Sequence, residues 1–130
     1  MKYRDIIENG RLVLHFAGKF TYKDADIIDL IINEFTNDCI RFISIDMSMI
    51  THIDDAALGM LLYFNQRLVE NGGLLTIENP IGDVTTALFN AKINELIHII
   101  GPSYEDRKLS SSEEIVWKLF DIDVKVNWIH

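Results

Sequence analysis

The sequence lacks the residues that crosslink, export or anchor many proteins. It has one cysteine, Cys39, so no internal disulfide can form, and a reducing compartment such as the cytoplasm is the simplest interpretation. Residues 1–10 have no apolar signal core, and the longest apolar run, 57–64, is too short to cross a bilayer. We therefore expect a cytoplasmic protein with no direct membrane insertion.

Basic residues are also scarce and scattered. Lysine and arginine total 12 against 20 acidic residues, which gives a net charge of -8 at pH 7, with a pI near 4.8. Because nucleic-acid phosphates would be repelled by such a surface, we expect no nucleic-acid partner.

Recognisable catalytic or metal-binding sets are missing as well. The sequence has no Gly-rich phosphate loop and no nucleophile motif, and its histidines lack metal-ligand spacing: His15, His52, His98 and His130. We therefore predict a protein that is not an enzyme, with no catalytic residues, no metal and no cofactor.

What is present is an α/β pattern in a chain of 130 residues, long enough for one well-packed domain. The expected order is strand, strand, helix, strand, helix, strand, helix, strand. The predicted strands are 3–7, 11–17, 41–46, 74–78 and 97–100, and the predicted helices are 22–35, 54–70 and one opening at Asn79-Pro80.

Apolar spacing also predicts which faces are buried. In strand 11–17 we expect Leu12, Leu14 and Phe16 inside, with Arg11, Val13 and His15 on the outer face. The helices should bury the following residues: Ile27, Ile28, Leu30, Ile31 and Phe35; then Leu58, Leu61, Leu62, Asn65 and Val69; then Val84, Leu88 and Ala91.

Turn and cap signals separate these elements. Asn9-Gly10 predicts a hairpin, and Gly18 is expected to end the second strand. Thr21 and Asp24 have the spacing of a capping box, Asp54 suits an N-cap, and Gly72 follows the central helix as a C-terminal cap would.

Residues 103–130 form a C-terminal extension that we expect to pack on the same domain as residues 1–102. One of Ser110, Ser111 and Ser112 should cap a helix with the stripe Ile115, Val116, Leu119 and Phe120. After it, Ile122, Val124, Val126 and Trp128 alternate with polar residues, which predicts a half-buried strand. That strand would either cover an edge of its own sheet or pair across two chains in a homodimer.

Three carboxylates border the predicted loop 47–53: Asp46, Asp54 and Asp55. Three carboxylates can hold Mg²⁺, and an acidic cluster is also typical of phosphoacceptor receiver domains. The spacing argues against both, because two of the acids are adjacent at one helix start. A strand-end aspartate followed by a helix cap is the favoured interpretation.

At these residues the chain resembles the STAS domain of bacterial anti-sigma-factor antagonists. The match consists of Asp46, seven further residues, and then the run Asp54, Asp55, Ala56, Ala57, Leu58 and Gly59. The resemblance implies a mixed sheet of about five strands with helices mainly on one face. The sequence departs from the family at Asp55, which stands where the family has its phosphorylated serine.

The resemblance implies a partner-switching protein. Its partner would be an anti-sigma factor that is also a serine kinase of the histidine-kinase-like ATPase class, or a related regulatory protein. Asp55 carries about one negative charge against roughly 1.5 to 2 for phosphoserine, so it imitates the phosphorylated state only partly. The domain is then a fixed binder, or it is held in a released-like state, or the acceptor has moved to Thr51 or Ser48.

The predicted partner surface comprises Thr51, His52, Asp54, Asp55, Ala56, Gly59 and Met60, together with Phe20, Thr21, Tyr22 and Asp24. Phe20 and Tyr22 fit interface anchors, but they fit a hydrophobic staple and core packing as well. STAS-like domains also serve as accessory subunits of ABC transporters, so that role and a structural dimer scaffold remain alternatives.

Overall fold

The structure, a computed structural model, describes residues 1–8, 11–37 and 40–101. Its strands are β1 (Lys2–Glu8), β2 (Arg11–Phe20), β3 (Phe42–Ile53), β4 (Leu74–Glu78) and β5 (His98–Ile100). Its helices are α1 (Ala25–Asn37), α2 (Asp55–Glu70) and α3 (Asp83–Asn90), with short 3-10 turns η1 (Tyr22–Asp24) and η2 (Ile93–Glu95). This order of strands and helices is the predicted one.

The strands form one mixed sheet in the order β1-β2-β3-β4-β5. β1 and β2 pair antiparallel, as the predicted hairpin requires. The pairs β2–β3, β3–β4 and β4–β5 are parallel, and each parallel connection runs through a helix. The predicted α/β fold with a mixed five-stranded sheet is confirmed.

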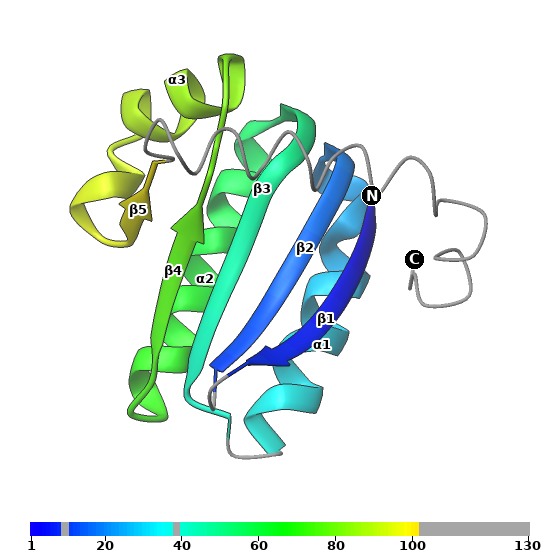
Figure 1. Ribbon diagram of the computed structural model, residues 1–130, viewed down its shortest axis with the longest axis vertical. Helices are drawn as coiled ribbons and strands as arrows, with labels where there is room; N and C mark the ends of the chain where they lie inside the picture. The colour runs from blue at the N-terminus through cyan, green and yellow to red at the C-terminus, as the bar shows by residue number, and fades with distance from the viewer. Residues whose placement is uncertain (9–10, 38–39, 102–130) are drawn as a thin grey trace.

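The long helices α1 and α2 lie side by side behind the sheet (Figure 1). We call the sheet face that they cover the inner face and the opposite one the outer face. Leu12, Leu14 and Phe16 of β2 are fully buried on the inner face, as predicted, beside Ile43 and Ile45 of β3. This layer is the hydrophobic core.

The predicted loop 47–53 is wrong, because β3 continues to Ile53. Met47 and Ile50 are buried, so this segment supplies core side chains instead of leaving the sheet. Gly18 likewise does not end β2. It takes a left-handed φ of +95° inside the strand, next to a register shift, and β2 then pairs on to Phe20.

The predicted stripes of α1 and α2 are each partly wrong. In α1, Leu30 is exposed and Ile32 is buried. In α2, Val69 is exposed, Leu62 and Asn65 are only half-buried, and the interior positions are Ala57, Leu58, Leu61, Phe64 and Leu68. Both helices carry apolar residues around more than one face, so the contact with the sheet decides which face is buried.

The third helix starts later than predicted, at Asp83 instead of Pro80. Pro80 lies buried before it, and Asn79 takes a positive φ of 58°, which turns the chain at the end of β4. Val84 and Leu88 face the core as expected, but Ala91 is exposed beyond the helix end. No helix in the described ranges is long and apolar enough to span a membrane. The predictions for Asn9-Gly10 and for 103–130 lie outside the described residues.

Candidate functional site

The start of α2 is built around the Asp54 carboxylate. Asp54 has an extended backbone, and its Oδ1 accepts a hydrogen bond from the Ala57 N–H at 2.8 Å, which confirms it as the N-cap. Asp55 occupies the first turn, where the helix dipole favours a negative charge. Since Asp54 already caps the helix, the exposed Asp55 carboxylate has no capping role to fill.

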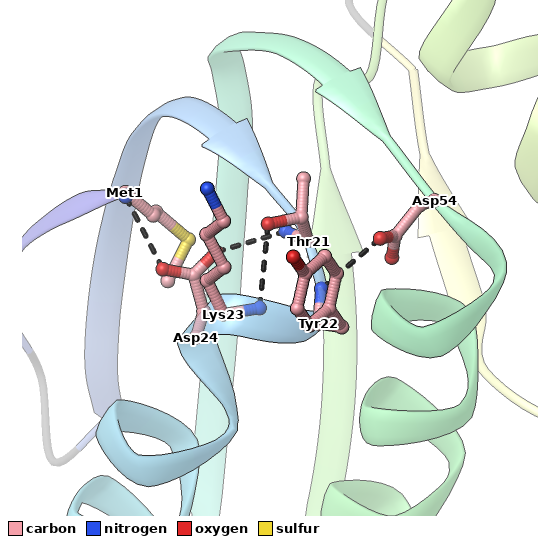
Figure 2. A network of polar contacts seen from close by, with 6 residues as sticks. All are labelled: Met1, Thr21, Tyr22, Lys23, Asp24 and Asp54. Carbon is pink, nitrogen blue, oxygen red and sulfur yellow. Dashed lines mark hydrogen bonds and ion pairs between the residues drawn. The ribbon is translucent and has the colours of Figure 1, made fainter.

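The second oxygen of Asp54 joins this helix start to the segment after β2. Its Oδ2 accepts a hydrogen bond from the Tyr22 N–H at 3.0 Å, and the Asp54 N–H donates to the Phe20 carbonyl at 3.2 Å. Figure 2 shows the Asp54 carboxylate turned towards the Tyr22 backbone. Asp54 therefore joins the two halves of the predicted partner surface through both its backbone N–H and its side chain.

The segment before α1 is held by the predicted capping box, which is confirmed. Thr21 Oγ1 accepts from the Lys23 N–H, and Asp24 Oδ2 accepts from the Thr21 N–H at 2.8 Å. The other oxygen, Asp24 Oδ1, forms an ion pair with the N-terminal ammonium of Met1, with an N–O distance of 3.2 Å (Figure 2). Asp24 is thus a buried structural anchor and presents little surface to a partner.

The predicted partner residues fall into three groups by exposure. Phe20 is fully buried and packs edge-on against Phe16, with 5.5 Å between ring centroids, so the core-packing interpretation holds for its side chain. Thr21, Asp54 and Met60 are half-buried. The exposed group consists of Tyr22, Thr51, His52, Asp55, Ala56 and Gly59.

Gly59 lies one helical turn after Asp55 and is exposed. A Cβ added there would meet no atom within 4 Å outside the nearby backbone of its own helix. Glycine inside a helix costs roughly 0.5–1 kcal/mol relative to alanine. No contact in the described structure requires this glycine, but it leaves the helix backbone bare beside Asp55.

Asp46 does not join the other two carboxylates. It lies in the middle of β3 on the outer face, where its Oδ2 is 3.0 Å from His15 Nδ1 and its Oδ1 accepts from the Ser48 N–H at 3.0 Å. Burial alone would raise the pKa of Asp46, but the hydrogen bonds from His15 and Ser48 outweigh it and lower the pKa below its usual value. Within the described ranges, no three His, Cys, Asp or Glu side chains are grouped as a metal site.

The His15–Asp46 contact was not predicted, although the strand pattern placed His15 correctly on the outer face. Its cause is the parallel register, which sets His15 directly opposite Asp46. The two residues are 31 positions apart in sequence. Only a prediction of register could have found the pair.

Comparison with known proteins gives a consistent result for most of the chain. The family model described as the STAS domain matches residues 3–107. A comparison with curated protein sequences finds no significant match.

Several solved structures have the same fold at low sequence identity. A candidate anti-sigma factor antagonist from Thermotoga maritima is 18% identical with a TM-score of 0.72, covering 82% of this chain and 92% of its own. The anti-sigma factor antagonist SpoIIAA, in its unphosphorylated form, is 12% identical with a TM-score of 0.60, covering 85% and 97%. A sulfate transporter family protein from Wolinella succinogenes is 15% identical with a TM-score of 0.66, covering 85% and 91%.

Proposed function

The chain belongs to the STAS domain family, and on this premise we propose that it is a non-enzymatic protein-interaction module of bacterial signalling, similar to anti-sigma factor antagonists. In this proposal it binds a regulatory partner through the start of α2 and the adjoining η1 segment. The partner class is an anti-sigma factor with a histidine-kinase-like ATPase fold. We place the protein in the cytoplasm, which the single Cys39 supports.

The observation that carries this proposal is that Asp54 caps the helix while the adjacent Asp55 is exposed. The Asp54 side chain accepts a hydrogen bond from the Ala57 N–H at the helix start and another from the Tyr22 N–H, which fixes the neighbouring segment. Asp55 is exposed and its side chain makes no hydrogen bond with the described residues, so its charge is presented to the surroundings. An exposed charge that neither caps the helix nor binds a neighbouring side chain fits recognition by another molecule.

Asp55 also defines how this module differs from a phosphorylated switch. A serine kinase cannot modify a carboxylate, so the charge at position 55 is permanent. We propose that the partner has adapted to this carboxylate and binds the domain without phosphorylation at this position. The exposed residues around it are Tyr22, Thr51, His52, Ala56 and Gly59, and we assign them to the contact surface.

The test is affinity capture from lysate of the native host, with and without ATP, followed by mass spectrometry. The unmodified protein is compared with Asp55→Asn, which removes the charge at nearly constant shape, and with Asp55→Ser, which restores the family's hydroxyl. We expect the unmodified protein to capture a kinase-like anti-sigma factor, and Asp55→Asn to capture less.

Two results would contradict this proposal in different ways. If only Asp55→Ser captures the kinase, the carboxylate blocks binding and the domain is held in a released-like state. If all three forms capture the same protein equally, position 55 is only a helix start. Intact-mass measurement of protein from the native host checks the remaining possibility, phosphorylation at Thr51 or Ser48.

A second candidate function is supported by the fold shared with the Wolinella succinogenes sulfate transporter family protein. In this alternative the chain is an accessory module of a membrane transporter, such as an ABC transporter. Capture of transporter subunits by the unmodified protein and by both position-55 variants would favour it over the signalling role.

A further inference from the structure

The outer face of the sheet is buried in its middle although neither long helix covers it. Figure 1 shows α1 and α2 behind the sheet, and no described helix lies over the middle of β2 and β3 on the other side. The register places Val13 beside Ser44 on this face, and His15 beside Asp46. Only 4% of Val13, 0% of Ser44 and 7% of Asp46 is exposed.

Local polar contacts explain part of this burial. The Ser44 and Thr76 hydroxyls are hydrogen-bonded to each other, and Arg11 Nη1 of β2 reaches Glu78 Oε1 of β4 at 3.2 Å. Since β3 lies between β2 and β4, the Arg11–Glu78 ion pair spans β3. These contacts account for Ser44. The apolar Val13 has half-buried Ile6 of β1 directly opposite it on the same face, and no described helix covers the middle of the sheet there (Figure 1).

The margin of the same face is apolar and exposed. Phe42 and Leu74 are directly opposite each other on β3 and β4, and they are 52% and 50% exposed. Ile100, opposite Glu78 on β5, is also exposed. When one face of a sheet is exposed to water, the side chains that point to that face along each strand are mostly polar. This face is instead typical of one that receives a covering layer.

The chain itself provides a suitable cover. Residues 102–130 follow β5, which is the strand beside β4 at the edge of the sheet. A seven-residue strand spans about 23 Å, while three strand spacings amount to about 14 Å, so the segment is long enough to cross the face. In an extended conformation, Ile122, Val124, Val126 and Trp128 would form one apolar side, because they alternate in the sequence with polar residues.

We propose that residues 103–130 pack across the outer face, with the apolar side of 122–128 against Val13 and Phe42. A second copy of the chain is the competing occupant. The tethered segment is favoured because a short linker gives it an effective concentration in the millimolar range, above that of a separate molecule at ordinary protein concentration. The placement leaves the start of α2 free and does not depend on the proposed function.

Tryptophan fluorescence of the full chain tests this placement selectively. Both tryptophans, Trp117 and Trp128, lie in this segment, so no other part of the chain contributes to the signal. In the Trp117→Phe protein only Trp128 remains. We expect its emission to be blue-shifted, and its quenching by acrylamide to be reduced, relative to the same protein in guanidinium chloride.

Substitutions on the sheet then locate the contact. In the Trp117→Phe background, Val13→Lys and Phe42→Lys should each shift Trp128 emission towards the unfolded value. Phe42 is half-exposed, so Phe42→Lys keeps the test valid if Val13→Lys fails to fold. The matched control is Ile7→Lys, because Ile7 is exposed on β1 but opposite Leu12 on the inner face, and it should leave the emission unchanged.

Three results would overturn the proposal. Equal quenching of Trp128 in folded and unfolded protein would mean that the segment is not packed. Protection that survives both lysine substitutions would mean that it packs elsewhere. Protection that disappears on dilution, together with a change in molecular mass, would assign the outer face to a second copy.

Discussion

Replacing Gly59 with alanine should raise the stability of the fold and weaken partner binding. Gly59 lies inside α2 without a positive φ, and an added Cβ would enter open space. Alanine in an exposed helix interior is more favourable than glycine by roughly 0.5–1 kcal/mol, because the unfolded chain has less conformational freedom to lose. We therefore expect the unfolding free energy to rise by about that amount.

The effect on binding should have the opposite sign. If the partner packs on the bare backbone beside Asp55, an extra methyl group overpacks that contact. Overpacking costs typically about 1–3 kcal/mol, which corresponds to a Kd increase of roughly fivefold to a hundredfold or more. Urea denaturation followed by circular dichroism measures the first effect, and titration calorimetry with the captured partner measures the second.

Asn33→Ala is the matched control for Gly59→Ala. Asn33 is exposed in the interior of α1, outside the proposed surface, so its substitution should also stabilise through helix propensity but leave the Kd unchanged. An unchanged Kd for Gly59→Ala would remove Gly59 from the contact surface. Loss of stability in Gly59→Ala would refute the inference that the site is open.

Substitutions at three further positions test contacts within the fold. Asp54→Ala should cost about 0.5–2 kcal/mol of stability through the lost cap. Asp54→Ser should keep most of that stability but speed hydrogen exchange of the Tyr22 amide, because its shorter side chain cannot hold both contacts. Asp46→Asn should cost about 1–2 kcal/mol at neutral pH. Because the folded pKa of Asp46 is lowered, its stabilisation is present above pH 4 and lost in more acidic solution, so the variant should show a flatter acid denaturation curve. Tyr3→Phe should be neutral or stabilising near pH 7, since the buried Tyr3 hydroxyl has no hydrogen-bond partner in the described structure. Burial raises the pKa of Tyr3 to about 12, so the folded state holds its proton longer than the unfolded state, and Tyr3→Phe should remove the stability loss between about pH 10 and 12.

Features set by neighbours in sequence were predictable. The Asp54 cap and the Thr21–Asp24 capping box each join groups three residues apart, so residue type and spacing suffice to specify them. The hairpin and the order of elements follow from turn residues and from the spacing of apolar residues, which is every second residue in strands and every third or fourth in helices. The family's helix-start motif could be recognised in the sequence because it lies in one uninterrupted run of the chain.

Features that depend on packing between distant segments were not predictable. β3 continues through 47–53 because β2 continues beside it past Gly18, and neither extension is visible within its own segment. The buried sides of α1 and α2 were set by the sheet, since both helices offer more than one apolar face.

The same limit applies to the candidate site. The sequence by itself determined the chemistry at the start of α2, because a cap and an exposed acidic first turn are local properties. Only the tertiary structure decided that Asp54 also holds Tyr22, 32 residues away, and that Asp46 pairs with His15 instead of joining Asp54. The physical reason is strand register: it is fixed by the burial of whole strands together, and it selects which distant side chains meet.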